Sequence, residues 1–462
     1  MKSNGLMNMT EGTPWKLILV FSLPMLLGNF LQQMYNVIDS VIVGQYVGPT
    51  ALAAVGTAFP VIFLLISMFI GFGVGATIII SQYYGAGNRE GVQKTIDTIY
   101  VTLFAFAIPL TLIGVFLARP LLIMMNTPSD VLDQATIFMQ ITFVGTIGMF
   151  GYNVNAGILQ GLGDSKSPLI YLGMSTFMNI SLVILFVAGF KWGVAGAATA
   201  TIISQMFAFI FGIWHINRKQ DYIRISFRKL KFDKAIFKDC VKLGLPAGLQ
   251  NVTFSLGIMV LQGLINSYQM IFMAGFNAAS KIDAIAFMPM MTFSSAITTY
   301  VGQNIGAGRM DRVKKGLNAT LALSSLFCVI ICPLILLLAG PLLTMFTDDV
   351  GVIQAGMAYL FRVVPFYLIL SVMFVITGAL RGAGESMIPL ISAVISLWLA
   401  RLPLAYLLAG TGRDNLFYSW PLGWLVGLVI VVAYYMTGRW KNKSRDRMMS
   451  PEIAGEIENA LL

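Results

Sequence analysis

The sequence Q-N-I-G-A-G-R-M-D-R-V-K-K, residues 303–315, repeats an earlier stretch, Q-Y-Y-G-A-G-N-R-E-G-V-Q-K, residues 82–94, at an offset of 221 positions. A second motif keeps the same offset of 221, as G-I-L-Q-G-L-G-D-S-K-S-P-L-I over residues 157–170 and G-A-L-R-G-A-G-E-S-M-I-P-L-I over residues 378–391. Two motifs that share one register indicate a chain built from two copies of one unit.

The chain around these motifs is strongly apolar. Of its 462 residues 57% are hydrophobic and 11% are charged, and the mean hydropathy is +0.80. A soluble domain carries about a quarter charged residues. A membrane helix needs about 20 mostly apolar residues, and twelve such stretches cover residues 15–43, 51–79, 96–117, 132–157, 168–189, 194–215, 238–266, 274–301, 317–339, 352–378, 388–409 and 417–438. The sequence therefore predicts an all-α, polytopic membrane protein with twelve transmembrane helices.

The repeat divides these spans into two pseudo-symmetric six-helix lobes. An even number of spans returns the chain to the side where it started, so the repeat is parallel, about an axis along the membrane normal. We expect lobes over residues 1–216 and 238–440, a basic cytoplasmic linker over residues 217–237 and a cytoplasmic tail over residues 441–462. The cavity between the lobes is the expected substrate site.

Basic residues set the expected orientation, because short loops rich in Lys and Arg stay in the cytoplasm. With the N-terminus inside, the basic runs 218–242 and 309–315 are cytoplasmic, whereas the opposite loops hold only Arg119, Lys191 and Arg413. We therefore expect a multi-pass protein of the inner or plasma membrane, in contact with the lipid bilayer, with both termini cytoplasmic. Because the net charge of +10 is spread over the inner loops, it implies no nucleic-acid partner.

The motif glycines are predicted to lie where helices end and the chain reverses, since such places favour residues that tolerate positive φ. The run G-F-G-V-G at residues 71–75 is not a dinucleotide loop, because no strand precedes it. The sequence contains no G-x-x-x-x-G-K-[ST] loop and a single histidine. We expect no enzymatic activity, no cofactor and no structural metal site.

Charged groups within apolar spans are the first candidates for function, because a charge in the membrane costs about 2.5–3.5 kcal/mol even on the gentler scales. Asp39 lies on the first span, and Gln32, Tyr35 and Asn36 precede it on one polar stripe. Such a carboxylate can take up a proton, or it can join neutral oxygens around Na⁺. The alternative is an aspartate near the outer interface that points into water.

The second half has a different set of charges. Lys281 and Asp283 lie on the eighth span, and Arg401 lies on the eleventh. We expect Asp283 to form a structural ion pair with Lys281 or Arg401; contact with substrate in the cavity is the alternative. Met288 on the eighth span adds a flexible thioether suited to a promiscuous cavity.

Two prolines mark helices that are expected to bend. Pro24 and Pro246 lie at matching positions in the first and seventh spans. Each removes a backbone donor, which kinks a helix. A kink in the helix that carries Asp39 links protonation to movement of a lobe in this interpretation.

Several segments together resemble the multidrug and toxic compound extrusion (MATE) transporters. They are V-G-Q-N-I-G-A-G at residues 301–308, L-R-G-A-G at 380–384, the pattern Asn36-x-x-Asp39-x4-Gly44 and A-A-V-G at 53–56. The resemblance covers residues 15 to 438. It implies two six-helix lobes around a central cavity, and export of cationic or amphiphilic organic compounds in exchange for inward Na⁺ or H⁺.

The resemblance also implies roles for single residues. It assigns cation coupling to Asp39, accompanied by Asn36 and by polar positions that match Asn179 and Thr201. The family often has an acid four residues after the fifth-span Asn, where this chain has Val183, which weakens the case for Na⁺ at Asp39. Where one branch of the family places acids on its seventh span, this chain has Gln250, Asn251 and Gln262, which we expect to line the substrate cavity instead.

We therefore expect a monomeric secondary transporter that exports small organic substrates by alternating access. The main alternative is a lipid-linked oligosaccharide flippase of the same superfamily, whose cavity would be strongly cationic to hold a diphosphate. Lys281, Arg362 and Arg401 favour that alternative. An intramembrane enzyme or a passive channel is disfavoured, because the sequence has no H-E-x-x-H or G-x-S-x-G motif and duplicated halves suit alternating access.

Overall fold

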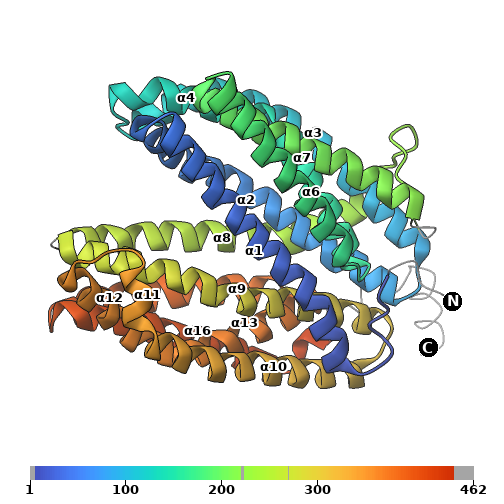
Figure 1. Cartoon of the computed structure of the whole chain (residues 1–462). Helices are drawn as coiled ribbons and strands as arrows, with labels where there is room; N and C mark the ends of the chain where they lie inside the picture. Colours follow the sequence, from blue (N-terminus) through green and yellow to red (C-terminus); the bar gives the residue numbers. More distant parts are fainter. Residues whose placement is uncertain (1–5, 220–222, 269, 442–462) are drawn as a thin grey trace. The chain divides into compact units, whose positions relative to one another are not determined.

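The computed structural model describes residues 6–219, 223–268 and 270–441, and within these ranges it is helical without strands (Figure 1). Eleven helical spans are long and apolar enough to cross a membrane, and a bent pair of helices makes a twelfth. The predicted twelve spans are thus confirmed, and the helices begin and end within seven residues of the expected bounds.

The first half contains α1 to α7, with the bounds Pro14–Tyr46 (α1), Pro49–Gly85 (α2), Arg89–Met124 (α3), Ser129–Val144 (α4), Thr146–Gly161 (α5), Lys166–Val183 (α6), the π-helix Ile184–Gly189 (η1) and Gly193–Lys219 (α7). Of the predicted linker, residues 220–222 lie outside the described residues.

The second half contains Lys234–Asn266 (α8), Met270–Gly306 (α9), Met310–Leu337 (α10), Ala339–Thr344 (α11), Val350–Val363 (α12), Val364–Phe366 (η2), Tyr367–Gly382 (α13), Met387–Val394 (α14), the π-helix Ile395–Arg401 (η3), Leu402–Ala409 (α15), Arg413–Tyr418 (η4), Ser419–Met436 (α16) and Arg439–Lys441 (η5). Most of the predicted tail, residues 442–462, lies outside the described residues.

One glycine of each motif copy has the left-handed conformation predicted for it. In the first motif φ is 71° at Gly87 and 69° at Gly308, and in the second motif φ is 88° at Gly163 and 84° at Gly384. The hydrogen bonds repeat as well: Asn88 N–H donates to Tyr83 O over 2.9 Å, and Arg309 N–H to Asn304 O over 2.8 Å. Each motif therefore ends a helix with the same glycine-dependent C-terminal cap, and the duplication seen in the sequence is also present in three dimensions.

Other motif glycines serve helix packing instead, which corrects the prediction that they all mark chain reversals. A Cβ on Gly157 would lie 2.8 Å from Thr77 Oγ1, and one on Gly378 would lie 2.2 Å from Ser294 O. The close approach allows a hydrogen bond between helices in both halves. Thr77 donates to Gly157 O over 3.1 Å, and Thr298 donates to Gly378 O over 2.9 Å. The positions again differ by the repeat offset, so α5 packs on α2 as α13 packs on α9.

The fourth and tenth spans are both interrupted near their middle. Gly145 separates α4 from α5, and the two helices meet at a bend of 50°. In the second half the short 3-10 segment η2, which contains Pro365, separates α12 from α13. Neither interruption was predicted, although the glycine and the proline are the residues that tolerate such breaks.

Contacts divide the chain into two compact units that differ from the predicted lobes at two helices. Unit 1 comprises residues 1–8 and 23–248, and unit 2 comprises residues 9–22 and 249–462. The division falls inside α1, between Ser22 and Leu23, and inside α8, between Gly248 and Leu249. The first part of each half's opening helix thus belongs to the unit that contains most of the other half.

Close packing of glycines explains why the start of α8 belongs to unit 1. A Cβ on Gly71 of α2 would lie 2.3 Å from Gly248 N, and one on Gly75 would lie 2.5 Å from Cys240 O. The backbones of α2 and α8 therefore touch, which requires residues without side chains at these positions. The G-F-G-V-G run is thus a helix-crossing surface, in agreement with the exclusion of a nucleotide loop.

Large apolar side chains cover the outside of the helices. Phe116 and Phe177 are each 76% exposed, and Leu337 is 80% exposed. Apolar exposure on this scale is unusual for a protein in water and suits contact with lipid.

The glycine packing predicts a contrast between two neighbouring substitutions in α2. Gly71→Ala should lower stability by about 1–3 kcal/mol, because the new methyl group meets backbone atoms that cannot move aside. Gly73→Ala is the matched control, since a Cβ there meets nothing within 4 Å and alanine is the better helix former. Thermal unfolding of the purified variants measures both. Equal melting temperatures for Gly71→Ala and the unmodified protein would contradict the packing explanation.

Candidate functional site

Two of the predicted coupling residues, Asn179 and Thr201, meet Tyr35 of the predicted polar stripe inside unit 1. Tyr35 of α1 donates its phenol O–H to Thr201 Oγ1 over 3.0 Å, and Asn179 of α6 donates from Nδ2 over 3.3 Å. Thr201 donates in turn to Ala197 O over 3.1 Å. Tyr35 and Asn179 are buried. One hydroxyl group therefore joins α1 to the pair α6 and α7, which lies more than 100 residues further along the chain.

Asp39 lies one helical turn after Tyr35 and is half-buried. Residues four apart on a helix lie on one face, so the Asp39 and Tyr35 side chains are neighbours on α1. Its Oδ1 atom is buried and has no hydrogen-bond partner in the described part of the chain. A buried carboxylate oxygen without a partner is costly, so binding a proton or a cation would relieve this position.

A small cavity extends the polar site along α6. Its volume is about 20 Å³, enough for about one water molecule. Its lining includes Gln32 and Tyr35 from α1, together with Tyr152, Leu172, Ser175, Thr176 and Gln205. Tyr35 lines this cavity and also bonds to Thr201. The predicted residues Gln32 and Tyr35 therefore belong to the same site as Thr201.

Sequence reasoning missed the α6 residues of this site. Leu172, Ser175, Thr176 and Asn179 follow the spacing of one helical face, so starting from Asn179 and counting backwards by turns would have found Ser175 and Thr176. The Thr176 hydroxyl is also buried without a hydrogen-bond partner among the described residues. The polar face of α6 is thus longer than the single Asn179 that was predicted.

Asn36 and Val183 lie away from this cluster. Asn36 is exposed, and its only contact in the hydrogen-bond set of the described residues is through its backbone carbonyl, which accepts from Ser40. Val183 is fully buried in an apolar cluster with Ile42 and Val43. The position where an acid was considered is therefore surrounded by apolar side chains.

The carboxylate of Asp283 in unit 2 contacts tyrosines, which corrects the predicted ion pair. Tyr359 and Tyr367 each donate a phenol O–H to it. Asp283 is absent from the ion pairs of the described residues, and Lys281 is exposed. Arg401 is likewise absent from the ion pairs of the described residues. The ion-pair interpretation failed because residues of the tenth span, next to Asp283 in space, offered neutral donors.

The two tyrosines lie on either side of the break in the tenth span. Tyr359 belongs to α12, and Tyr367 is the first residue of α13. One carboxylate on α9 therefore joins both segments across η2. In the first half, Ile62 occupies the position that corresponds to Asp283 at the repeat offset, so this connection exists in unit 2 alone.

Arg401 is held by an aromatic ring instead of an acid. Its guanidinium carbon lies 3.8 Å from the centre of the Trp420 ring, which is a favourable cation–π distance. Arg362, the other deep arginine, pairs with Asp414 over 3.7 Å. Arg362 and Arg401 therefore each have a partner of their own.

The other predicted cavity residues are dispersed through unit 2. Gln250 is buried and accepts a hydrogen bond from Arg381. Gln262 donates to Asn266 over 2.8 Å. Asn251 and Met288 are half-buried. Their role as substrate contacts stays a prediction.

Pro24 and Pro246 both lie inside unbroken helices, α1 and α8. Each is within two residues of the position at which its helix passes from one unit to the other. Bending at these prolines stays a prediction. The described residues contain no group of three or more His, Cys, Asp or Glu side chains that could hold a metal ion.

Known proteins match this chain over nearly its whole length. The MatE family model matches residues 24–185 and again residues 246–407, once in each half. Probable multidrug resistance protein YpnP of Bacillus subtilis is 32% identical over 94% of this chain and 97% of its own length. An FAD transporter of Shewanella oneidensis is 24% identical over 92% of this chain and 94% of its own length.

Solved structures agree with the fold. A crystal structure of MATE in complex with MaL6 matches with a TM-score of 0.89 and covers 96% of this chain and all of that chain, at 22% identity. At this identity the likeness supports the architecture, with its twelve spans and two halves, and says nothing about substrate.

The hydrogen bonds of Thr201 predict a stability difference between two substitutions. Thr201→Val leaves the Tyr35 phenol and the Asn179 amide without an acceptor, which should cost about 1–3 kcal/mol, whereas Thr201→Ser keeps the hydroxyl. Thermal unfolding should rank the variants in that order. Thr57→Val on α2 is the control, because that exposed hydroxyl bonds only to Ala53 O of its own helix. A loss in Thr57→Val as large as in Thr201→Val would contradict the cluster.

The tyrosine pair at Asp283 predicts non-additive effects. Tyr359→Phe and Tyr367→Phe should each destabilise the protein by about 1–3 kcal/mol, because each leaves the buried carboxylate one donor short. The double variant should differ from the sum of the single ones, since both donors share one acceptor. Tyr406→Phe, at a tyrosine that is 55% exposed, should have no effect. Additive losses in a double-mutant cycle would show that the tyrosines act independently of Asp283.

Proposed function

Because this chain belongs to the MATE family of transporters, we propose that it exports cationic or amphiphilic organic compounds across the cell membrane in antiport with an inward-moving cation. Asp39 is the coupling residue in this proposal, and the two halves give access to each side of the membrane in turn. The observation that supports it is the buried Asp39 oxygen without a partner, next to the cluster of Tyr35, Asn179 and Thr201.

The hydrogen bonds of the cluster favour H⁺ over Na⁺ as the coupling ion. A threonine hydroxyl has one donor and two acceptor sites. Thr201 accepts from Tyr35 and Asn179 and donates to Ala197 O, so all three are in use. No lone pair is left on Thr201 for Na⁺, which needs several oxygen ligands. A proton on Asp39 needs no rearrangement of these contacts.

The surroundings of the carboxylate support the same choice. A second acid would add charge and oxygen ligands for a metal cation, but Val183 stands in an apolar cluster. A single carboxylate in such surroundings is neutralised most simply by protonation. Neutral Asp39 would then favour a different packing of α1 against α6 and α7 from the one favoured by the charged form.

Export of an anionic, flavin-containing molecule is the second candidate. It follows from the relative named as an FAD transporter and from the Arg401 guanidinium on the Trp420 ring in unit 2. Aromatic and basic groups together suit a flat ring system that carries phosphates. The lipid-linked oligosaccharide flippase gains no support, because Arg362 and Arg401 have separate partners and the relatives are named for multidrug resistance and FAD transport.

We also propose that the protein works as a monomer in the inner or plasma membrane with both termini in the cytoplasm. The basic runs 218–242 and 309–315 support this orientation.

Transport by purified protein in liposomes tests the proposed function. A fluorescent lipophilic cation and FAD are offered separately, under an imposed pH gradient or an imposed Na⁺ gradient. We expect the pH gradient to drive movement of the lipophilic cation and the Na⁺ gradient alone to drive none. Asp39→Asn, which cannot exchange a proton, should lose the pH-driven part while keeping its fold.

Two results would overturn parts of this proposal. Full pH-driven transport by Asp39→Asn would remove Asp39 from coupling. Driven movement of FAD but not of the lipophilic cation would replace the first substrate class by the second. Ser40→Ala is the matched control, because Ser40 is exposed, lies next to Asp39 and bonds only to Asn36 O of its own helix.

A further inference from the structure

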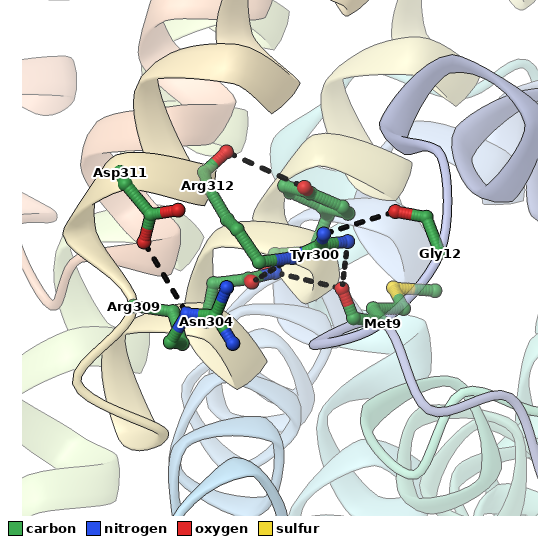
Figure 2. A network of polar contacts seen from close by, with 7 residues as sticks. All are labelled: Met9, Gly12, Tyr300, Asn304, Arg309, Asp311 and Arg312. Carbon is green, nitrogen blue, oxygen red and sulfur yellow. Dashed lines mark hydrogen bonds and ion pairs between the residues drawn. The ribbon is translucent and has the colours of Figure 1, made fainter.

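The segment before α1 is held in place by the first repeated motif of unit 2. Residues 9–12 lie beside the end of α9 and the start of α10, and Figure 2 shows Arg312 and Asn304 pointing at the backbone of this segment. The motif was singled out above for its glycines alone. The polar side chains of the motif, Asn304 and Arg312, bind the segment before α1.

Four hydrogen bonds hold two residues of the segment through their main chain. Arg312 donates from Nη2 to Met9 O over 3.1 Å and from Nη1 to Gly12 O over 2.9 Å. Asn304 donates from Nδ2 to the same Met9 O over 3.1 Å. Met9 N–H donates to Gln303 Oε1 over 2.9 Å. The Met9 side chain is fully buried, so the segment is docked and not lying loosely on the surface.

The Arg312 side chain makes its hydrogen bonds at this contact. Its side chain is only 8% exposed, although it was counted above among the basic residues of a surface loop. Its Nε donates to Asn304 Oδ1 over 3.0 Å, and none of the ion pairs of the described residues includes it. Nη1 and Nη2 of Arg312 thus bond to the segment itself, and Nε bonds to Asn304, which also binds the segment. Hydrogen bonds from a charged donor are stronger than neutral ones, and a planar fork can span two carbonyl groups as a lysine cannot.

The first copy of the motif cannot make this contact. At the repeat offset, Asn304 corresponds to Tyr83 and Arg312 corresponds to Gly91. A Cβ on Gly91 would lie 2.7 Å from the Tyr83 ring, so the tyrosine fills the space there. The backbone of the two copies is alike, yet the two side chains that grip the segment are those that differ. The contact is therefore specific to the second copy of the motif and is not a consequence of the repeated fold.

The segment leads directly into α1, which suggests what the contact does. Residues 9–22 belong to unit 2, and from Leu23 onward α1 belongs to unit 1 and carries Asp39. The helix is unbroken from Pro14 to Tyr46. At a rise of about 1.5 Å per residue, Asp39 lies about 37 Å along α1 from Pro14. A helix fixed at its start can carry a change at Asp39 back to unit 2, whereas a helix with a loose start cannot.

We propose that Arg312 and Asn304 are positioning residues for ion coupling, which fix the start of α1 to unit 2 so that a change at Asp39 acts on both units. This inference rests on the proposed function of Asp39. Substrate recognition does not depend on it, because neither residue lies among the polar groups of the candidate site. The expected defect is a loss of coupling with substrate binding retained.

The test compares Arg312→Gln and Asn304→Ala with Arg309→Gln. Arg309 is the matched control, since it lies in the same loop, is exposed and pairs with Asp311 over 3.3 Å (Figure 2). Each purified variant is placed in liposomes, and three quantities are measured: affinity for the lipophilic cation, the number of protons moved per substrate, and hydrogen exchange of the amides in residues 13–22.

Arg312→Gln should leave the affinity unchanged, lower pH-driven export by about tenfold, the size of a typical coupling between sites, and lower the proton-to-substrate ratio. Amide exchange in residues 13–22 should rise. Asn304→Ala should show the same pattern more weakly and covers the case in which Arg312→Gln does not fold. Arg312→Lys should restore part of the coupling, and Arg309→Gln should match the unmodified protein.

Two outcomes separate this inference from the function on which it rests. If Asp39→Asn abolishes pH-driven export while Arg312→Gln and Asn304→Ala keep the normal proton-to-substrate ratio, the anchoring role is wrong and the function of Asp39 stands. If Asp39→Asn exports normally, the proposed function fails first. Loss of affinity in step with loss of export in both anchor variants would show a general structural role and would also overturn the inference.

Discussion

One buried oxygen atom constrains the first unit more than any other: Oδ1 of Asp39, which has no hydrogen-bond partner among the described residues. Within a membrane a lone carboxylate costs about 2.5–3.5 kcal/mol or more, and the nearest hydroxyl cannot help because Thr201 already uses its donor and both acceptors. The site is therefore complete except at the carboxylate. We propose that the two charge states of Asp39 favour different packings of this unit.

Helix α1 connects the position of Asp39 to both units. It belongs to unit 2 up to Ser22 and to unit 1 from Leu23, and its approach is held through the Met9 and Gly12 carbonyls. Pro24, just past the change of unit, leaves the Val20 carbonyl without its helical donor. We propose that α1 deforms most easily at this proline, which lies between its two attachments, so that a change in packing at Asp39 is absorbed or passed on there.

Much of the architecture was predictable because it depends on local patterns. Apolar stretches of membrane length predicted the twelve spans, and the offset of 221 positions predicted both the duplication and the left-handed glycines that end each motif. Asn179 and Thr201 were predicted only through resemblance to a family, and their hydrogen bonds with Tyr35 were not predicted. Which helices touch depends on their rotation and tilt, and a single sequence carries no record of either.

The failures have the same origin. Asp283 was expected beside a basic residue because charges in lipid need partners, but Tyr359 and Tyr367 of another span satisfy it. Arg312 was counted with exposed loop residues because its neighbours in sequence are charged, and it is buried against a segment about 300 positions away. Gly157 and Gly378 were taken for turn residues because the approach of a second backbone cannot be read from one helix.

Infrared difference spectroscopy on the purified protein tests most directly whether Asp39 changes its protonation state. Spectra recorded as the pH is raised and lowered should contain the carbonyl stretch of a protonated carboxylic acid, and that band should be absent in Asp39→Asn and present in Asp283→Asn. A band that is unchanged in Asp39→Asn, or one that disappears only in Asp283→Asn, would contradict the central role given to Asp39.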